Sequence, residues 1–144
     1  DWPNIDFMMT PPVFSANCNY IVFATKSTIY TIDITGNNLR KLIQYDNANK
    51  LRIYSLLFSP NNKFVLFAAE GFKRNEWISG LYLFDLEKET IKRLNDFSMF
   101  YTFSPDSKNI VYLSGFERFN CGLYAMDIDG ENKRQISPNC EWCY

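Results

Sequence analysis

Short runs of apolar and β-branched residues, separated by polar turns, recur along the whole chain. We expect strands at 20–25, 28–34 and 38–43, then at 51–58, 64–69, 80–86 and 90–94, and finally at 97–103, 109–114, 122–128 and 133–136. Such runs, rich in Val, Ile, Phe and Tyr, are typical of strands. No stretch of ten or more residues has apolar positions at helical spacing, so the pattern predicts an all-β chain with almost no helix.

Turn residues support this interpretation. Thr35-Gly36-Asn37 and Asp129-Gly130 each lie between two predicted strands, and Asp-Gly in that setting is typical of a hairpin. Asp127–Asn132 also resembles part of a calcium-binding loop, but Ile136 stands where an EF-hand needs its bidentate glutamate. We therefore interpret this segment as a hairpin turn. An entry strand is expected over Phe7–Val13, weakly paired because Pro11-Pro12 lacks two backbone donors.

The pattern of strands is repeated three times. A Phe-Ser pair occurs at 14, 58 and 103, so successive copies are 44 and 45 residues apart, which is the length of a four-stranded propeller blade. In the second copy, the run Phe64–Phe67 is apolar at every position. Such a strand must be covered on both faces, as it is when blades stack face to face.

The third copy resembles a known repeat. Phe103–Lys108, Ile110–Tyr112, Leu123–Gly130 and Lys133–Ile136 are similar to the TolB-type, WD40-like β-propeller repeat. The second copy matches well, and the first departs from the repeat at Ala16–Asn19. The resemblance implies the fold: three four-stranded blades of a partial ring, with residues 139–144 as the first strand of a fourth blade.

These boundaries describe one domain over residues 1–144, with blades at about 7–43, 51–94 and 97–136. Closed propellers have four to eight blades, and the resemblance implies six. An isolated arc of three blades would expose two apolar faces. Three resolutions remain open: the sequence is part of a longer chain, two arcs form one six-bladed ring as a homodimer, or the arc is stable alone.

The balance of charges and the length of the apolar runs argue against two classes of partner, nucleic acids and membranes. The chain has 15 basic and 16 acidic residues, so no net positive field favours nucleic acid. The apolar runs are far shorter than a membrane span, and the first residues do not resemble a signal peptide, so we expect no membrane insertion.

Catalytic and metal sites are not indicated. The chain has no histidine, which excludes Ser-His and Cys-His nucleophile systems and removes the commonest metal ligand. No carboxylate pair stands in a recognisable motif. We expect no catalytic residues, no metal and no cofactor.

Among the four cysteines, one pair is a candidate for a disulfide bond. Cys140 and Cys143 are spaced as CxxC, but residues i and i+3 of a strand point to opposite faces, and no second CxxC would complete a zinc site. Cys121 and Cys140 are expected at one rim, which is compatible with a disulfide in an oxidising compartment. Buried thiols are the alternative.

The strongest functional hint is the segment between the second and third strands of each copy. It is short in the first copy, whereas the second inserts Glu70–Ser79 and the third Ser114–Asn120, both with Gly-Phe-x-Arg. We expect these loops to share one face of the propeller and to present aromatic and basic residues typical of binding hot spots. The candidate partner-binding residues are Phe72, Lys73, Arg74, Trp77, Phe116, Arg118 and Phe119. In the alternative interpretation the Phe side chains cap the blade ends and each Arg pairs with a nearby Glu.

The sequence therefore predicts a non-catalytic recognition or scaffold module for a protein or peptide partner, with a glycan as a further candidate ligand. Alternatives are an accessory propeller of a larger peptidase or glycan-active enzyme, and a self-associating half-propeller. The resemblance favours a periplasmic or secreted location.

Overall fold

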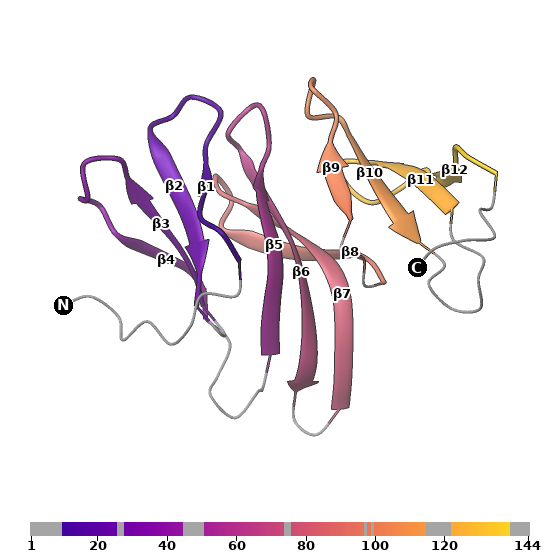
Figure 1. Cartoon of the computed structure of the whole chain (residues 1–144), viewed down its shortest axis with the longest axis horizontal. Coiled ribbons are helices and arrows are strands. Elements are labelled where there is room, and N and C mark those ends of the chain that lie inside the picture. Colours follow the sequence, from indigo (N-terminus) through magenta and orange to yellow (C-terminus); the bar gives the residue numbers. More distant parts are fainter. Residues whose placement is uncertain are drawn as a thin grey trace.

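The structure is a computed structural model that describes residues 10–25, 28–44, 51–73, 76–96, 98, 100–114 and 122–138, with only the backbone described at 51, 72, 73 and 76. These residues form twelve strands in three four-stranded antiparallel sheets and contain no helix. No described helix could therefore cross a membrane. The sheets stand side by side as three blades (Figure 1). The predicted all-β fold is confirmed.

Each blade is a meander in which consecutive strands pair. Blade one contains β1 (Val13–Phe14), β2 (Tyr20–Ala24), β3 (Thr28–Asp33) and β4 (Arg40–Gln44). Blade two contains β5 (Leu51–Phe58), β6 (Phe64–Lys73), β7 (Glu76–Asp85) and β8 (Thr90–Asn95). Blade three contains β9 (Tyr101–Phe103), β10 (Asn109–Ser114), β11 (Gly122–Asp127) and β12 (Arg134–Gln135).

Two apolar cores hold the blades together. Each blade has a forward face, toward the blade that follows in sequence, and a backward face, toward the blade that precedes it. The core between blades one and two joins Val22 and Ile29 to Val65, Phe67 and Phe84. The core between blades two and three joins Leu66, Leu81 and Leu83 to Ile110, Tyr112 and Met126. Blade two is covered on both faces, which explains why Phe64–Phe67 is apolar throughout.

The same turn links the first two strands of every blade. In blade two the Ser59 hydroxyl donates to Asn61 Oδ1 at 2.7 Å and accepts from the Phe64 amide at 2.9 Å. Ser15 and Ser104 make the equivalent bonds in the other two blades. Each turn also has one residue at positive φ, namely Cys18, Asn62 or Ser107. The turn therefore depends on Ser and Asn or Asp side chains that mimic backbone hydrogen bonds.

One prediction about blade two was wrong. Residues 70–79 were expected to form a loop, but β6 continues to Lys73 and β7 begins at Glu76. Their register is regular from Phe64–Asp85 to Lys73–Glu76. The first copy has only a short connection at this point, which favoured an inserted loop in the second copy. Trp77 and Ile78 nevertheless have high strand propensity, and pairing with the facing strand decides the outcome.

The other predicted elements lie close to their expected positions or outside the described residues. β1 begins at Val13, and residues 7–9 of the predicted entry strand are not among those described. The predicted strand at 139–144 also lies outside them. Asp127–Gly130 forms the expected turn, in which the Gly130 amide donates to Asp127 O at 2.9 Å and Gly130 has a φ of +86°.

Candidate functional site

The candidate site is the end of blade two that extends past its neighbours. β6 and β7 have ten residues each, whereas β2, β3, β10 and β11 have five or six. β5 follows the extension, since Leu51 pairs with Gly71. The three strands project below the other two sheets in Figure 1. A regular three-stranded sheet thus presents this end, where an irregular loop was expected.

A tyrosine from blade three fixes β5, the first strand of blade two, at the base of the extension. The register of β5 and β6 shifts between Tyr54 and Leu56, and Ser55 there has a φ of +47°. The Tyr101 hydroxyl fills this bulge: it accepts from the Ala68 amide at 2.9 Å and lies against the carbonyls of Tyr54 and Ser55. Burial raises the pKa of the Tyr101 hydroxyl, so it remains a neutral donor.

An arginine holds β7, the strand on the other side of the extension. The pairing of β8 with β7 ends at Leu81, and beyond this point the Arg93 guanidinium takes the place of a β8 backbone donor by donating to Ser79 O at 2.9 Å. Arg93 also pairs with Asp96 at 2.9 Å. A Cβ at Gly80 would lie 2.8 Å from Arg93 Nε, so glycine leaves the room that the guanidinium occupies. The extension is therefore tied to the blade on both sides.

Polar side chains cover the forward face of the extension. Arg52 pairs with Glu70 across β5 and β6, and Glu70 pairs with Ser79 across β6 and β7, so the three share a face. The Tyr54 hydroxyl donates to Glu70 Oε1 at 2.7 Å. Burial, followed by this hydrogen bond to Glu70, raises the pKa of Tyr54. The Tyr54–Glu70 pair fixes an acceptor group in place.

Trp77 lies on the same face, two residues beyond Ser79. Side chains alternate along a strand, so Trp77 and Ser79 share the face on which Leu81 and Leu83 pack against blade three. Leu81 is fully buried, but Trp77 is 56% exposed. Beyond the contact with blade three, the forward face thus combines an exposed indole with charged and hydroxyl groups.

The structure tests the predicted site residues only in part. Phe72 and Lys73 are the last two residues of β6, with Phe72 opposite Trp77, so these three residues belong to strands rather than to a loop. Arg74, Phe116, Arg118 and Phe119 lie outside the described residues, as do Cys121 and Cys140. The expected cluster of the two Gly-Phe-x-Arg segments stays a prediction.

Sequence reasoning missed Arg52, Tyr54 and Glu70. Glu70 is the first charged residue after six apolar ones, Phe64 to Ala69, and this break could have marked where the blade core ends. Arg52 and Tyr54 alternate with Leu51 and Ile53, a pattern that assigns them to one face. Among the described residues, no group of three or more Cys, Asp or Glu residues is arranged to hold a metal ion.

The stacked four-stranded sheets and the repeated turn define the class of the fold as a β-propeller. Solved structures agree. TolB from Acinetobacter baumannii has a TM-score of 0.61 and 18% identity over 91% of this chain and 33% of that chain. An oligogalacturonate lyase in complex with manganese gives 0.67 and 13% over 90% and 36%, and a nidogen/laminin complex gives 0.64 and 12% over 91% and 48%.

The fold is therefore TolB-like, as the repeat indicated. The chain spans from a third to about half of the length of these structures. At this identity the likeness establishes the fold alone, since the matched propellers include enzymes as well as non-enzymatic proteins. No protein-family model matches the chain, and no curated protein matches it by sequence.

Proposed function

We propose that this chain is a recognition module that binds a protein or peptide partner on the forward face of the blade two extension. The observation that carries the proposal is the projection of β5, β6 and β7 beyond the neighbouring blades with Trp77 56% exposed on it. Conspicuous surfaces on a rigid scaffold often bind ligands, and Trp, Tyr and Arg are enriched among hot-spot residues.

Rigidity supports this proposal. Because Tyr101 and Arg93 hold the base of the extension, a partner would meet an already ordered surface and would lose less conformational entropy on binding. The Trp77 indole supplies apolar area, while Arg52 and the Glu70 carboxylate supply opposite charges. A partner with an apolar side chain flanked by polar groups fits this chemistry.

The predicted loop residues extend the proposal. Phe72 and Lys73 continue the same hairpin, and Arg74 follows directly in sequence. Phe116, Arg118 and Phe119 would join the surface if the blade three segment lies at this end. The same surface could also serve as the docking face of an accessory propeller in a larger enzyme, because TolB-like folds occur in a protease and in a puromycin hydrolase.

Trp77→Ala is the direct test. Peptides would be selected from a displayed random library against the full chain, and their affinities measured by calorimetry for the wild type and for the variant. We expect Trp77→Ala to weaken binding by about thirtyfold or more, since a hot-spot truncation costs roughly 2 kcal/mol or more. The melting temperature should change little because Trp77 is exposed.

Ile91→Ala is the matched control. Ile91 is also a large exposed apolar residue of blade two, 45% exposed on β8, but it lies away from the extension. It should leave both affinity and melting temperature unchanged. If the selected peptides bind Trp77→Ala as tightly as the wild type, the proposed surface is wrong. Arg74→Ala tests the predicted continuation separately.

A further inference from the structure

A cavity lies between blades one and two, next to the turns that join their strands. Its volume is about 370 Å³, within the range of roughly 300–1,000 Å³ that is typical of ligand pockets. Phe58 and Leu86 line it and also pack against the apolar core between these blades, so the cavity begins where that core ends. Its polar lining includes side chains from both blades, namely Asn17, Tyr20, Thr31, Asn38 and Arg40 of blade one and Asn62 of blade two.

The equivalent place at the next interface is filled with apolar side chains. By register, Thr31 of blade one corresponds to Leu83 of blade two, and Tyr20 corresponds to Phe64. Leu83 and Phe64 both contribute to the core between blades two and three. So do the blade three counterparts of the two apolar lining residues, namely Phe103 and Ile128. The same repeat therefore packs apolar residues at one interface and leaves a partly polar cavity at the other.

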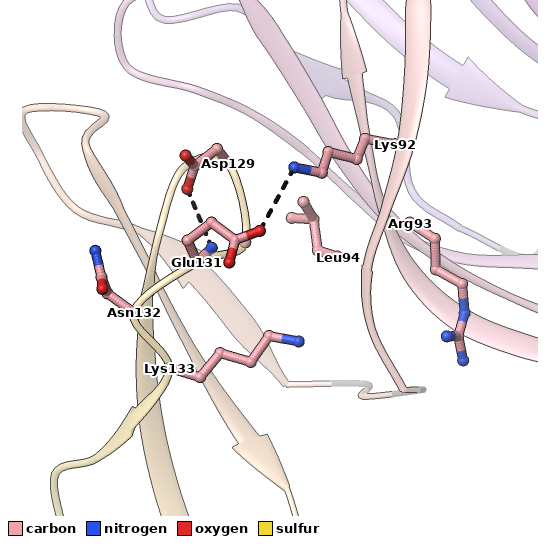
Figure 2. A pocket seen from close by; sticks show the side chains of 8 residues that line it. Lys92, Arg93, Leu94, Asp129, Glu131, Asn132 and Lys133 are labelled. Carbon is pink, nitrogen blue, oxygen red and sulfur yellow. Dashed lines mark hydrogen bonds and ion pairs between the residues drawn. The ribbon is translucent and has the colours of Figure 1, made fainter.

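The ion pair beside the cavity is common to both interfaces. Arg40 of β4 pairs with Glu89 of blade two, and Lys92 of β8 pairs with Glu131 of blade three at 4.0 Å. Figure 2 shows Lys92 directed at the Glu131 carboxylate, in a pocket that, unlike the cavity between blades one and two, is lined mainly by charged residues. Arg40 and Lys92 hold the same register position. The Arg40 guanidinium is therefore part of the contact between blades and is not an unpaired charge for a ligand.

The Thr31 hydroxyl gives the cavity a polar group that needs a partner. Thr31 is 8% exposed and lines the cavity, and no hydrogen bond joins its hydroxyl to another residue of the described part of the chain. A buried hydroxyl without a partner costs stability, and most buried polar side chains have one. The partner of Thr31 must therefore come from what occupies the cavity.

The neighbouring polar groups of the lining are neutral. Asn38 donates to Asp33 Oδ2 at 2.8 Å through its Nδ2, which leaves its Oδ1 as an acceptor for a ligand. Asn62 accepts the Asn17 backbone amide at 3.2 Å through its Oδ1, which leaves its Nδ2 as a donor. Tyr20 adds a hydroxyl that both donates and accepts. The described lining thus offers neutral donors and acceptors from both blades, together with apolar surface.

We propose that this cavity binds a neutral planar heteroaromatic ring of the nucleobase type, as a free base or a nucleoside. Such a ring has two apolar faces, and Tyr20 and Phe58 provide aromatic side chains from opposite blades for stacking. Its edge carries donors and acceptors, which the Asn38 oxygen, the Asn62 nitrogen and the Thr31 hydroxyl complement. A phosphate group would find no unpaired cation in the described lining, so the affinity should not depend on one.

Titration with nucleosides tests the proposal. The full chain would be titrated with adenosine, guanosine, cytidine and uridine, with the monophosphate of the tightest binder, and with methyl glucoside as a sugar without a base. Saturation-transfer NMR would detect binding and give the Kd. We expect at least one nucleoside to bind with a Kd of about 0.1–1 mM, while methyl glucoside should not bind. The monophosphate should bind within about threefold of its nucleoside, because Arg40 is paired.

Changes at Thr31 locate the ligand. Thr31→Leu introduces the residue that occupies the equivalent position in blade two, so it should fill the cavity and abolish binding without lowering the melting temperature. Thr31→Val removes only the hydroxyl and should weaken binding by about threefold to tenfold. Thr28→Val is the matched control, because Thr28 is 6% exposed on the same strand but does not line the cavity. It should leave the affinity unchanged.

If no nucleoside binds with a Kd below about 10 mM, or if binding survives both Thr31 variants, the proposal is wrong. Methyl glucoside binding that Thr31→Leu abolishes would show that the cavity takes a sugar, and a monophosphate that binds about tenfold tighter than its nucleoside would show a phosphate site; either result also overturns the proposal. Trp77→Ala should not change nucleoside affinity, because Trp77 lies on the forward face of blade two and the cavity lies at its backward face. This proposal and the protein-binding surface can thus fail independently.

Discussion

Blade one and blade three have the same repeat but differ in what covers the backward face. Phe14 and Phe103 hold the same position, directly before the turn serine, yet Phe14 is 59% exposed and Phe103 is 8% exposed. Ile34 and Ile128 are also equivalent; Ile34 is 57% exposed, whereas Ile128 packs into the core between blades two and three. The neighbour, and not the repeat itself, determines whether an apolar side chain stabilises the fold.

A second difference lies two residues before that phenylalanine. Blade three has Tyr101, whose hydroxyl bonds the bulge of blade two, while the equivalent position in blade one holds the exposed Pro12. A third difference lies in the turn, where blade three has Asp106 and blade one has Asn17. Each pair offers a matched comparison of a covered blade with one whose backward face meets no other described blade.

Truncating the two phenylalanines should give the largest contrast. Phe103→Ala should destabilise the protein by about 3–5 kcal/mol, because it leaves a cavity between blades two and three. Phe14→Ala removes a side chain that is mostly in water and should cost less than about 1 kcal/mol. The free energy of unfolding from urea titration measures both.

Similar losses for the two variants would contradict this comparison, since they would show that the backward face of blade one is covered in solution. Leu81→Ala on the forward face of blade two is a positive control, because Leu81 is fully buried in the same core as Phe103. It should cost about 2–5 kcal/mol.

The fold could be predicted because its information is local and repeated. The Phe-Ser pairs, the Asp-Gly turn and the apolar runs each specify a strand or a turn, and three copies in register specify how the sheets stack. The two-sided apolar run Phe64–Phe67 even indicated that blade two is covered on both faces, which the two cores confirm.

The candidate site was less predictable for a physical reason. Whether Glu70–Ser79 forms a loop or a hairpin depends on pairing between β6 and β7, which local propensity does not decide when Gly71 interrupts the run. The role of Arg93 depends on a contact with Ser79, fourteen residues away in the sequence, and that of Tyr101 on a bulge in another blade. Such contacts leave no local pattern in the sequence.

Removing the Tyr101 hydroxyl tests its hydrogen bonds to blade two, which the equivalent Pro12 of blade one cannot make. Tyr101→Phe leaves the Ala68 amide and the bulge carbonyls without their partner in a buried place, so it should cost about 1–3 kcal/mol. Tyr20→Phe is the matched control, because Tyr20 is 47% exposed, and it should change stability by less than about 0.5 kcal/mol. A neutral Tyr101→Phe would mean that the bulge does not depend on this hydrogen bond.

The smallest expected effect is a difference in acid sensitivity between the two turns. Hydrogen bonds from Ser104 and the Lys108 amide lower the pKa of Asp106 below 3.8. The ionised carboxylate therefore stabilises the folded state fully above about pH 3.8, and this contribution is lost as the pH falls through the lowered pKa.

Asp106→Asn should be nearly neutral at pH 7, since Asn17 and Asn61 accept the same bonds in the other blades. It should flatten the dependence of the unfolding free energy on pH below about 4. Asn17→Asp should steepen that dependence by placing the same carboxylate in blade one. If neither variant changes the slope in urea titrations across this pH range, the turn carboxylate does not contribute to acid stability, and the two turns are equivalent in spite of their charge.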